Sequence, residues 1–494
     1  MVEGEVYSFI PDASDPDNDR LTFNISNKPS WASFDVNSGA LTGTPGSNDS
    51  GIYDNINIVV SDGQAGATLP SFSINVQNAS SNPPPAPLPP VVSGEPVLLY
   101  SDLERGPSGS LVTVWGQNIP AGAGLTCGDQ ACEILSSDFD PAHPAHGRQP
   151  SRQKIVVRFN SGSGITLDGY NTLPFQLTGG QIRFVSPSDG AITLNGASSG
   201  DVVYLRGGRY TQSLSCFGAS AMICGDGNSG IAVVGYPGET AVLDCSQAAA
   251  FDVASGTLSD FTLANLEMDC GGVGRAIRAS RQGDRRNLRV VGNYVHDARS
   301  SNSGAFGEFS TTVDLFVLGN LVERTGVAGE NNAHAIYHGG RGISDNVHIS
   351  YNHIDTHLGG RAIQIFGHKE GERMTGLVIR GNHIVNSQGN AGILVSHSDA
   401  PAGLAPSDPA RGWIKDALVE YNTVEGGNGS GINIKNIGVD ATINNNVLID
   451  GSRSVLIDFA KSVVASDNCM NQPISTGQSI AQSNNQANYP VCLN

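Results

Sequence analysis

The sequence of 494 residues has little charge and few basic residues. Only 15% of the residues are charged, and 28 Lys and Arg stand against 46 Asp and Glu, giving a formal net charge of −18. A protein that binds nucleic acid along its length needs an excess of cations to contact the phosphates. We therefore expect no nucleic-acid partner.

The sequence also lacks a long apolar run and holds many residues that disfavour helix interiors. No stretch approaches the roughly 20 apolar residues of a membrane-spanning helix, so we expect no membrane span. The 62 Gly and 25 Pro are poorly tolerated inside helices, which argues against a helical bundle. Hydrophobic residues still make up 39% of the chain, enough for buried cores, so the composition indicates a β-rich, turn-rich protein.

Eight cysteines fall into close pairs that include no CxxC motif. The pairs are Cys127 with Cys132, Cys216 with Cys224, Cys245 with Cys270, and Cys469 with Cys492. The sequence alone leaves their connectivity open. We expect disulfides, and hence a secreted, cell-surface or periplasmic bacterial protein, with free buried thiols as the alternative. No signal peptide is visible, and we interpret Met1 as a start added after removal of a leader.

Residues 1–77 alternate apolar and polar side chains at strand period, as in Phe72-Ser-Ile-Asn-Val76. The motifs Asp12-Ala-Ser-Asp15-Pro-Asp17-Asn-Asp19 and Gly39-Ala-Leu41-Thr-Gly43-Thr-Pro45 resemble the cadherin-like and Ig-like modules of secreted bacterial proteins. This resemblance implies a small β-sandwich. The Asp15, Asp17 and Asp19 carboxylates could ligate Ca²⁺ or form a solvated acidic turn, so we expect no required cofactor and leave Ca²⁺ open.

Two further segments precede the repeats. Residues 78–96 contain Pro83-Pro-Pro-Ala-Pro-Leu-Pro-Pro90, which predicts a stiff, exposed linker. Residues 97–180 contain strand-like runs, and Thr113-Val-Trp-Gly-Gln-Asn118 with Cys127-Gly128 is similar to the Ig-like module known as the transcription-factor (TIG) type. This similarity implies a second β-sandwich.

From about residue 181 a short pattern, apolar-x-x-Asn-x-apolar, recurs at intervals of 22 to 40 residues. Its asparagines are Asn265, Asn293, Asn320, Asn352, Asn382, Asn422, Asn446 and Asn468. Self-similarity at this period is typical of solenoids. Each copy has room for three short strands, which predicts one coil of a parallel β-helix. The Asn amide can bond the backbone of its turn and the Asn of the next coil.

The repeat over residues 181–494 resembles the pectate-lyase-like right-handed parallel β-helix superfamily, beginning at Gly200-Asp-Val-Val-Tyr-Leu-Arg-Gly-Gly208. The resemblance implies coils of three strands and a substrate groove over the face of the first strands. It also implies that these first strands carry Ile277, Ile336, Ile363, Ile393 and Ile432. The expected fold is therefore all-β, a right-handed parallel β-helix preceded by two small Ig-like β-sandwich domains.

If the isoleucines point inward, their neighbours should point outward. The preceding residues would then form a small-residue floor for an extended polymer, unless they only ease stacking beside the turn. They are Ala276, Ala335, Ala362, Gly392 and Gly431. The following residues would form a mostly polar row beside that floor. They are Arg278, Tyr337, Gln364, Leu394 and Asn433.

The charge distribution favours an anionic polysaccharide as the partner. Residues 270–420 hold 15 Lys and Arg against 14 Asp and Glu, together with nine of the 11 histidines, whereas the rest of the chain is strongly acidic. A locally basic zone can hold an anionic polymer. We expect the protein to act as a monomer.

Candidate site residues gather on two neighbouring first strands. We predict His334, Tyr337, His338 and Arg361 as catalytic, although the inward parity of His338 would also fit a buried structural residue. The predicted substrate-binding residues are Arg278, Glu308, Gln364, His368, Lys369, His397 and Asn433. No metal site is predicted.

These residue types suit β-elimination in a uronic-acid polysaccharide, a polysaccharide lyase activity. The reaction needs cations or donors at the carboxylate, a base for the α-proton and an acid for the leaving oxygen. Arg361 with Arg278 suits the first role, His334 or His338 the second, and Tyr337 the acid or both proton transfers. The superfamily's clustered groove acids, Lys or Arg base and Ca²⁺ are not evident.

Two alternatives remain open. A glycoside hydrolase on the same fold needs two carboxylates across the groove. The candidates are Glu308, Glu370, Glu372 and Asp399, but we expect no acid at the outward positions of the first strands, which argues against a hydrolase. A non-catalytic glycan-binding adhesin would also use Ig-like modules and a β-helix.

Overall fold

A computed structural model describes the chain in segments, and the two compact units are Met1–Ala86 and Pro87–Asn494. The described residues are 7–15, 17, 19–46, 49, 51–76, 94–189, 197–211, 214–215, 230–252, 258–279, 285–299, 303–309, 312–340, 342–367, 372–397, 413–435, 439–449, 453–458, 460, 462–476 and 479–487.

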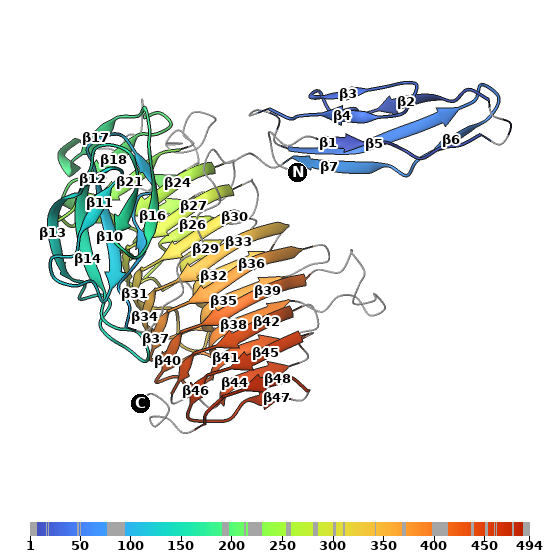
Figure 1. Cartoon of the computed structure of the whole chain (residues 1–494). Coiled ribbons are helices and arrows are strands. Elements are labelled where there is room, and N and C mark those ends of the chain that lie inside the picture. The colour runs from blue at the N-terminus through green and yellow to red at the C-terminus, as the bar shows by residue number, and fades with distance from the viewer. Residues whose placement is uncertain are drawn as a thin grey trace. The chain divides into compact units, whose positions relative to one another are not determined.

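The first unit is a small antiparallel β-structure of two sheets (Figure 1). Its strands are β1 (Tyr7–Phe9), β2 (Thr22–Ser26), β3 (Ala32–Phe34), β4 (Leu41–Gly43), β5 (Gly51–Ser61), β6 (Gly66–Thr68) and β7 (Phe72–Val76). The sheet order is β1-β4-β3 in one sheet and β2-β5-β6 in the other, where β7 also pairs with β5. Leu41, Ile56 and Val76 are fully buried between them. The Asp15 carboxylate accepts hydrogen bonds from the backbone N–H of Asp17 and Asp19, both at 2.9 Å, so it closes a turn.

The second unit begins with a two-sheet antiparallel module. Its strands are β8 (Val97–Ser101), β9 (Arg105–Gly106), β10 (Ser110–Gln117), β11 (Leu125–Cys127), β12 (Gln130–Ala131), β13 (Glu133–Phe139), β14 (Gln153–Phe159), β15 (Ser163–Leu167) and β16 (Thr172–Leu177). One sheet has the order β13-β14-β10-β8, and the other has the order β12-β11-β15-β16-β9, in which only the short β16–β9 pair is parallel.

The rest of the unit is a β-helix of three parallel sheets, as Figure 1 shows. The first-strand sheet consists of β20 (Leu214–Ser215), β23 (Phe251–Asp252), β26 (Ile277–Ala279), β29 (Ser303–Phe309), β32 (Ala333–Gly340), β35 (Arg361–Gly367), β38 (Ala391–His397), β41 (Ser430–Lys435), β44 (Arg453–Asp458) and β47 (Ser475–Thr476). Apart from one pair at the N-terminal end, neighbours in each sheet are three strands apart along the chain, so each complete coil contributes one strand to every sheet.

The other two sheets complete the coils. The second-strand sheet consists of β17 (Ile182–Val185), β18 (Val202–Leu205), β21 (Ala232–Gly235), β24 (Leu258–Ala264), β27 (Arg285–Val291), β30 (Thr312–Leu318), β33 (Ile343–Ser350), β36 (Arg373–Arg380), β39 (Trp413–Glu420), β42 (Val439–Asn444), β45 (Ser462–Ser466) and β48 (Ala481–Ser483). The third-strand sheet consists of β19 (Gly208–Tyr210), β22 (Ala241–Asp244), β25 (Glu267–Asp269), β28 (Tyr294–His296), β31 (Leu321–Thr325), β34 (His353–His357), β37 (His383–Val385), β40 (Thr423–Glu425), β43 (Val447–Leu448) and β46 (Cys469–Met470). A 3-10 helix, Pro187–Asp189, follows β17. The described residues include no helix long and apolar enough to cross a membrane.

The predicted asparagine ladder is present, with one correction at its start. Asn352 is typical, because its Nδ2 donates to Asn382 Oδ1 at 2.9 Å and to Val317 O at 3.0 Å. Asn265 is not a member: Leu266 occupies that register, and its N–H donates to Asn293 Oδ1. The repeat pattern is therefore shifted by one residue in that coil. At the other end the ladder extends to Asn485, which accepts from Asn468.

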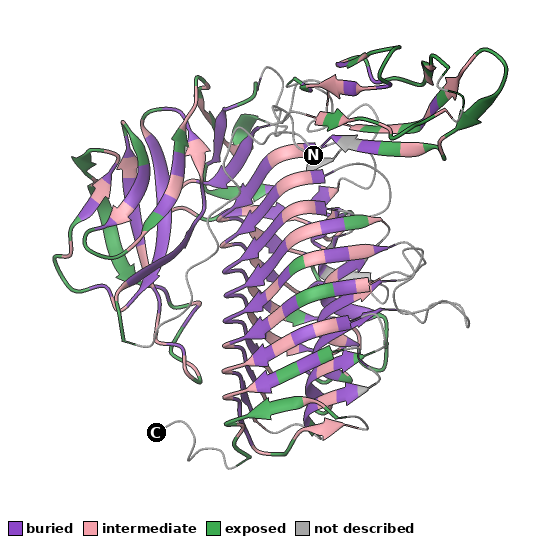
Figure 2. Cartoon of the chain, turned by 45° about the vertical axis from the view of Figure 1, so that its right-hand side comes forward, coloured by how far each residue is buried: buried purple, intermediate pink, exposed green. Residues whose placement is uncertain are grey.

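The first-strand isoleucines are fully buried, as predicted, and burial alternates along many strands (Figure 2). The small residues before them do not form an outward floor. Ala335 and Ala362 are fully buried in the same core, and a Cβ on Gly392 would lie 2.6 Å from Val424 of the core. The alanine and the isoleucine of these strands are thus both buried in the core, which argues against an outward floor and favours the alternative that the small residues ease stacking.

The second module shares a hydrophobic core with the β-helix. Tyr100 of this module stacks between Trp115 of the same module and Tyr351 of the β-helix. The centroid of the Tyr100 ring lies 5.0 Å from that of Trp115 and 5.5 Å from that of Tyr351. Buried Arg152 donates to Tyr100 Oη at 3.1 Å and to the carbonyl of Tyr351. A Cβ on Gly319 would lie only 1.9 Å from Tyr100 Oη, so this close approach requires glycine there. The module is therefore fixed to the face of the second-strand sheet.

Two of the four expected disulfides lie within the described residues. Cys127 is bonded to Cys132, and Cys245 to Cys270. Cys469 is also disulfide-bonded, whereas Cys216, Cys224 and Cys492 lie outside the described residues.

Candidate functional site

The candidate site is centred on the outward-facing row of residues on the first-strand sheet. Strand pairing places Arg278, Glu308, Tyr337, Gln364, Leu394 and Asn433 in one continuous register. Asp252 begins the same row beside Arg278. The row therefore contains two acids, which corrects the expectation that the outward positions hold none.

Arg278 is already neutralised within this row. Its Nε donates to Asp252 Oδ1 at 2.9 Å, and its Nη2 contacts the other carboxylate oxygen. A bidentate pair of this kind satisfies the guanidinium geometry. Arg278 is thus less suited to bind a substrate carboxylate than predicted.

Arg361 and His334 are brought together, as their spacing predicted. The backbone N–H of Arg361 donates to His334 Nδ1 at 3.2 Å. The Arg361 Nη1 donates to the carbonyl of Asn331 at 3.3 Å, and Asn331 Oδ1 accepts from Asn390 Nδ2 at 2.8 Å. The turns of three successive coils therefore hold the guanidinium in place.

His334 is a neutral hydrogen-bond donor in this arrangement. Burial, together with the charge of Arg361, lowers the pKa of His334 to about 3. Because Nδ1 accepts a backbone N–H, we assign the ring proton to Nε2. The ring stacks on Tyr337, with centroids 5.4 Å apart and an interplanar angle of 27°. A histidine with so low a pKa is a weak base, so its predicted role shifts toward positioning and donation.

Arg361 is a cation of this site that has no acidic partner among the described residues. No carboxylate within the described residues lies at ion-pair distance from it, and burial lowers its pKa. Its Nε is buried and makes no hydrogen bond to any described residue. A half-buried guanidinium without an ionic partner is stabilised by an anionic ligand, because the ligand offsets the cost of burying the charge.

His338 points into the core. It is fully buried and lies in register with Phe309 and Ile365. Neither ring nitrogen bonds to a described residue, and burial lowers its pKa to about 4. Because its ring cannot reach a polymer on the outer face, we remove it from the catalytic set.

Gln364 and Asn433 offer acceptors along the outward row. Gln364 Oε1 and Asn433 Oδ1 are buried and receive no hydrogen bond from the described part of the chain. Buried acceptors without donors are costly, and sugar hydroxyls are suitable donors.

The remaining predicted residues divide between the interior and the undescribed segments. His397 is buried, and its ring lies over Gly367, since a Cβ there would lie 2.1 Å from His397 Cδ2. Glu372, a hydrolase candidate, is buried just before β36 of the second-strand sheet. The side chain of Glu308 and all of His368, Lys369, Glu370 and Asp399 lie outside what the structure describes.

Two residues of this face were missed by the sequence reasoning. Phe366 and Lys435 lie in the next outward register, with Gly339 and Ser396. Phe366 lies two residues after Gln364, and Lys435 lies two residues after Asn433. The two-residue side-chain period of a strand could therefore have predicted both. Asn331 was missed because a turn residue has no periodic signal.

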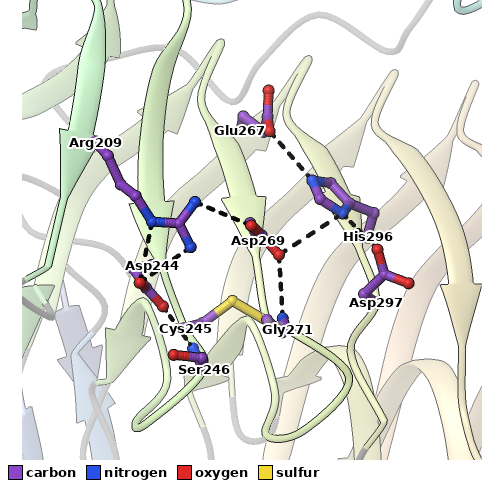
Figure 3. Close-up of a disulfide and its surroundings, with 10 residues drawn as sticks. Arg209, Asp244, Cys245, Ser246, Glu267, Asp269, Gly271, His296 and Asp297 are labelled. Atoms are coloured by element: carbon purple, nitrogen blue, oxygen red, sulfur yellow. Dashed lines mark hydrogen bonds and ion pairs between the residues drawn. A yellow bond between two sulfur atoms is a disulfide. The ribbon is translucent and has the colours of Figure 1, made fainter.

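A separate charged cluster lies on the third-strand sheet beside the Cys245–Cys270 disulfide (Figure 3). Asp269, His296 and Asp297 have ligand atoms within 4.8 Å of one another. Arg209 already binds Asp269 at 2.9 Å, and Arg324 binds Asp297 at 3.0 Å. These guanidinium groups supply the positive charge that a metal ion would bring, so the cluster reads as an ion-pair network.

Comparisons with known proteins identify only the first module. The family described as "Putative Ig domain" matches residues 2–77, which confirms the Ig-like prediction there. No curated protein matches the chain. Among solved structures, the pectate lyase Pel9A is 15% identical over 62% of this chain and 78% of its own, with a TM-score of 0.24.

Two other solved structures are equally distant. The catalytic domain of Agl-KA is 11% identical over 79% of this chain and 86% of its own, with a TM-score of 0.27. An endo-fucoidan hydrolase of glycoside hydrolase family 107 is 18% identical over 36% of this chain and 27% of its own, with a TM-score of 0.15. The β-helix assignment rests on the strand order of the three sheets, which confirms the all-β fold.

Proposed function

We propose that the first-strand face binds an anionic polysaccharide and cleaves it at a uronic-acid residue by β-elimination. The observation that carries this proposal is Arg361, a guanidinium held by Asn331 and the coil turns but paired with no described carboxylate. An acidic sugar supplies the missing anion. The acceptors of Gln364 and Asn433 extend the contacts over further coils.

The geometry supports the following proposed roles. Arg361 pairs with the uronate carboxylate and stabilises the charge that develops as the α-proton leaves. The Tyr337 hydroxyl gives its proton to the leaving oxygen while its oxygen takes the α-proton, so the phenol is restored at the end of the step. The electron pair of the broken C–H bond forms the C=C bond as the glycosidic C–O bond breaks. His334 stacks on Tyr337, and its Nε2–H serves as a hydrogen-bond donor at the site.

A glycoside hydrolase is the second candidate, and the position of Glu308 favours it. The backbone of Glu308 lies in register with Tyr337, so an acidic residue stands in the register over which the polymer would lie. Asp252 is two coils away, about 10 Å at the usual strand spacing. Its pairing with Arg278 disfavours a second catalytic acid there.

One assay separates the candidates. The full chain is incubated with alginate, polygalacturonate, glucuronan and chondroitin sulfate. Ultraviolet absorbance of an unsaturated uronate supports the lyase proposal. New reducing ends without that absorbance would mean hydrolysis, and retention of polymer without either product would mean a glycan-binding adhesin. The disulfides, the Ig-like module and the polysaccharide substrate fit an extracytoplasmic location, which we include in the proposal.

A further inference from the structure

A cleft separates the second module from the β-helix, away from the first-strand sheet. Its volume is about 440 Å³. One wall consists of β10, β13 and β14, including Phe139 and Lys154. The other consists of the turns that precede β22, β25 and β28, including Tyr236, Asn265 and Tyr294. Because neighbouring coils lie about 4.8 Å apart, the cleft follows three coils along the β-helix axis.

Phe139 presents an aromatic ring at this cleft. It ends the edge strand β13 and is 71% exposed. No ring contact joins it to another described aromatic residue. An exposed aromatic ring beside a cleft is typical of ligand-binding grooves, and the apolar faces of sugar rings can stack on it.

Two of the three acids that line the cleft are compensated, whereas Asp138 and the lysine form no ion pair among the described residues. Glu239 accepts from the Arg206 guanidinium and from the N–H of Gly207 at 2.7 Å. Glu267 accepts from His296 at 3.2 Å (Figure 3). Lys154 lies over the Trp115 ring, with Nζ 5.5 Å from its centroid. It forms no ion pair with any described carboxylate, including Asp138 opposite it in the sheet.

Asn265 adds a hydrogen-bond acceptor whose orientation is fixed. Its Nδ2 donates to Asp102 at 2.6 Å and to Thr113 at 3.2 Å, which fixes the amide. Its Oδ1 is buried and has no donor among the described residues. Among the described residues, the cleft thus combines an aromatic platform, a lysine without an ion pair and an acceptor without a donor, groups that suit an acidic saccharide.

We propose that this cleft is a second, non-catalytic binding site for the acidic polysaccharide. A sugar ring stacks on Phe139, a carboxylate pairs with Lys154, and a hydroxyl donates to Asn265. The identity of the polymer rests on the proposed function, whereas the existence of the site does not require turnover. The site holds the polymer on a different face from Arg361 and raises its concentration near the first-strand sheet.

The test measures retention of the full chain in native gels that contain alginate, polygalacturonate, glucuronan or chondroitin sulfate. We expect Phe139→Ala and Lys154→Met each to weaken the affinity for the retained polymer about tenfold. Phe139→Tyr, which keeps the ring, should retain the affinity. Tyr170→Ala is the matched control, because Tyr170 is 51% exposed in the same module and does not line the cleft. It should bind like the unchanged chain.

The outcomes separate this site from the lyase proposal. Weaker retention of Phe139→Ala and Lys154→Met without any product supports the cleft and overturns the lyase. Product formation with unchanged retention of both variants overturns the cleft alone. The cleft proposal also fails if none of the four polymers retains the unchanged chain, or if Tyr170→Ala weakens binding as much as Phe139→Ala.

Discussion

At the scale of single residues, the chemistry of the first-strand face depends on which side chains lack a partner. Arg278 was predicted to share the carboxylate-binding role of Arg361, but Asp252 neutralises it. His334 and His338 are four residues apart, yet one contacts Arg361 and the other lies in the core. Burial and pairing, rather than residue type, therefore decide which of them can meet a substrate.

His338→Leu tests the removal of His338 from the site. We expect turnover close to that of the unchanged chain, because the ring faces the core. We also expect an equal or higher melting temperature, since an apolar side chain replaces two buried nitrogens without described partners. Loss of turnover with an unchanged melting temperature would return His338 to the catalytic set.

Tyr337→Phe tests the proton transfer. The variant keeps the ring that stacks on His334 and loses only the hydroxyl. We expect kcat to fall by about 100-fold or more with the melting temperature unchanged, measured by product absorbance and thermal unfolding. A kcat within twofold or so of the unchanged chain would contradict the role given to Tyr337.

At the scale of elements, the asparagine ladder ties the coils together. Asn352 Oδ1 accepts from the N–H and the Nδ2 of Asn320, while its own Nδ2 donates to two acceptors. We expect Asn352→Ala to lower the free energy of unfolding by about 2–3 kcal/mol or more, measured by chemical denaturation. Asn428→Ala is the control, because Asn428 is exposed outside the ladder, and should change stability by less than about 0.5 kcal/mol.

Much of this architecture could be predicted from the sequence, because every coil of a solenoid repeats the same local pattern of buried residues and turn residues. The ladder and the buried isoleucines follow from a strict period. The failures occur where one coil departs from it. Asn265 stands one residue before its ladder position, and Ala335 is buried in the core beside Ile336.

The candidate site was less predictable for the same reason. The spacing predicted the contact between His334 and Arg361, but pairing such as that of Arg278 depends on neighbours in other coils. Asn331 holds Arg361 from a turn, where no period reveals it. The cleft at Phe139 lies between two modules that the sequence presents as separate segments.

At the scale of the whole molecule, histidines lie where the second module meets the third-strand sheet. His146 stacks on His383 with ring centroids 4.1 Å apart, and His383 contacts Glu425 and His353. Burial lowers the pKa of His143 to about 4 and the pKa of His146 well below its usual value. Arg152 adds positive charge near both.

These shifts predict that acid weakens the folded unit. The folded-state pKa values are depressed, so the unfolded chain binds protons first as pH falls below about 6.5. Stability from the neutral rings is fully present above that pH and is lost progressively toward about pH 4. We expect the melting temperature to fall over this window, and His146→Phe to make the fall shallower. A melting temperature independent of pH from 7 to 4 would contradict this account.

The most direct test of the central claim compares the unchanged chain with Arg361→Ala on the acidic polymer that it cleaves. Arg324→Ala is the control, because Arg324 is an exposed arginine whose ion pairs lie on the third-strand face. We predict that the initial rate of unsaturated product falls at least about 100-fold in Arg361→Ala and stays unchanged in Arg324→Ala. Equal rates in all three chains would contradict the claim that Arg361 binds the substrate carboxylate.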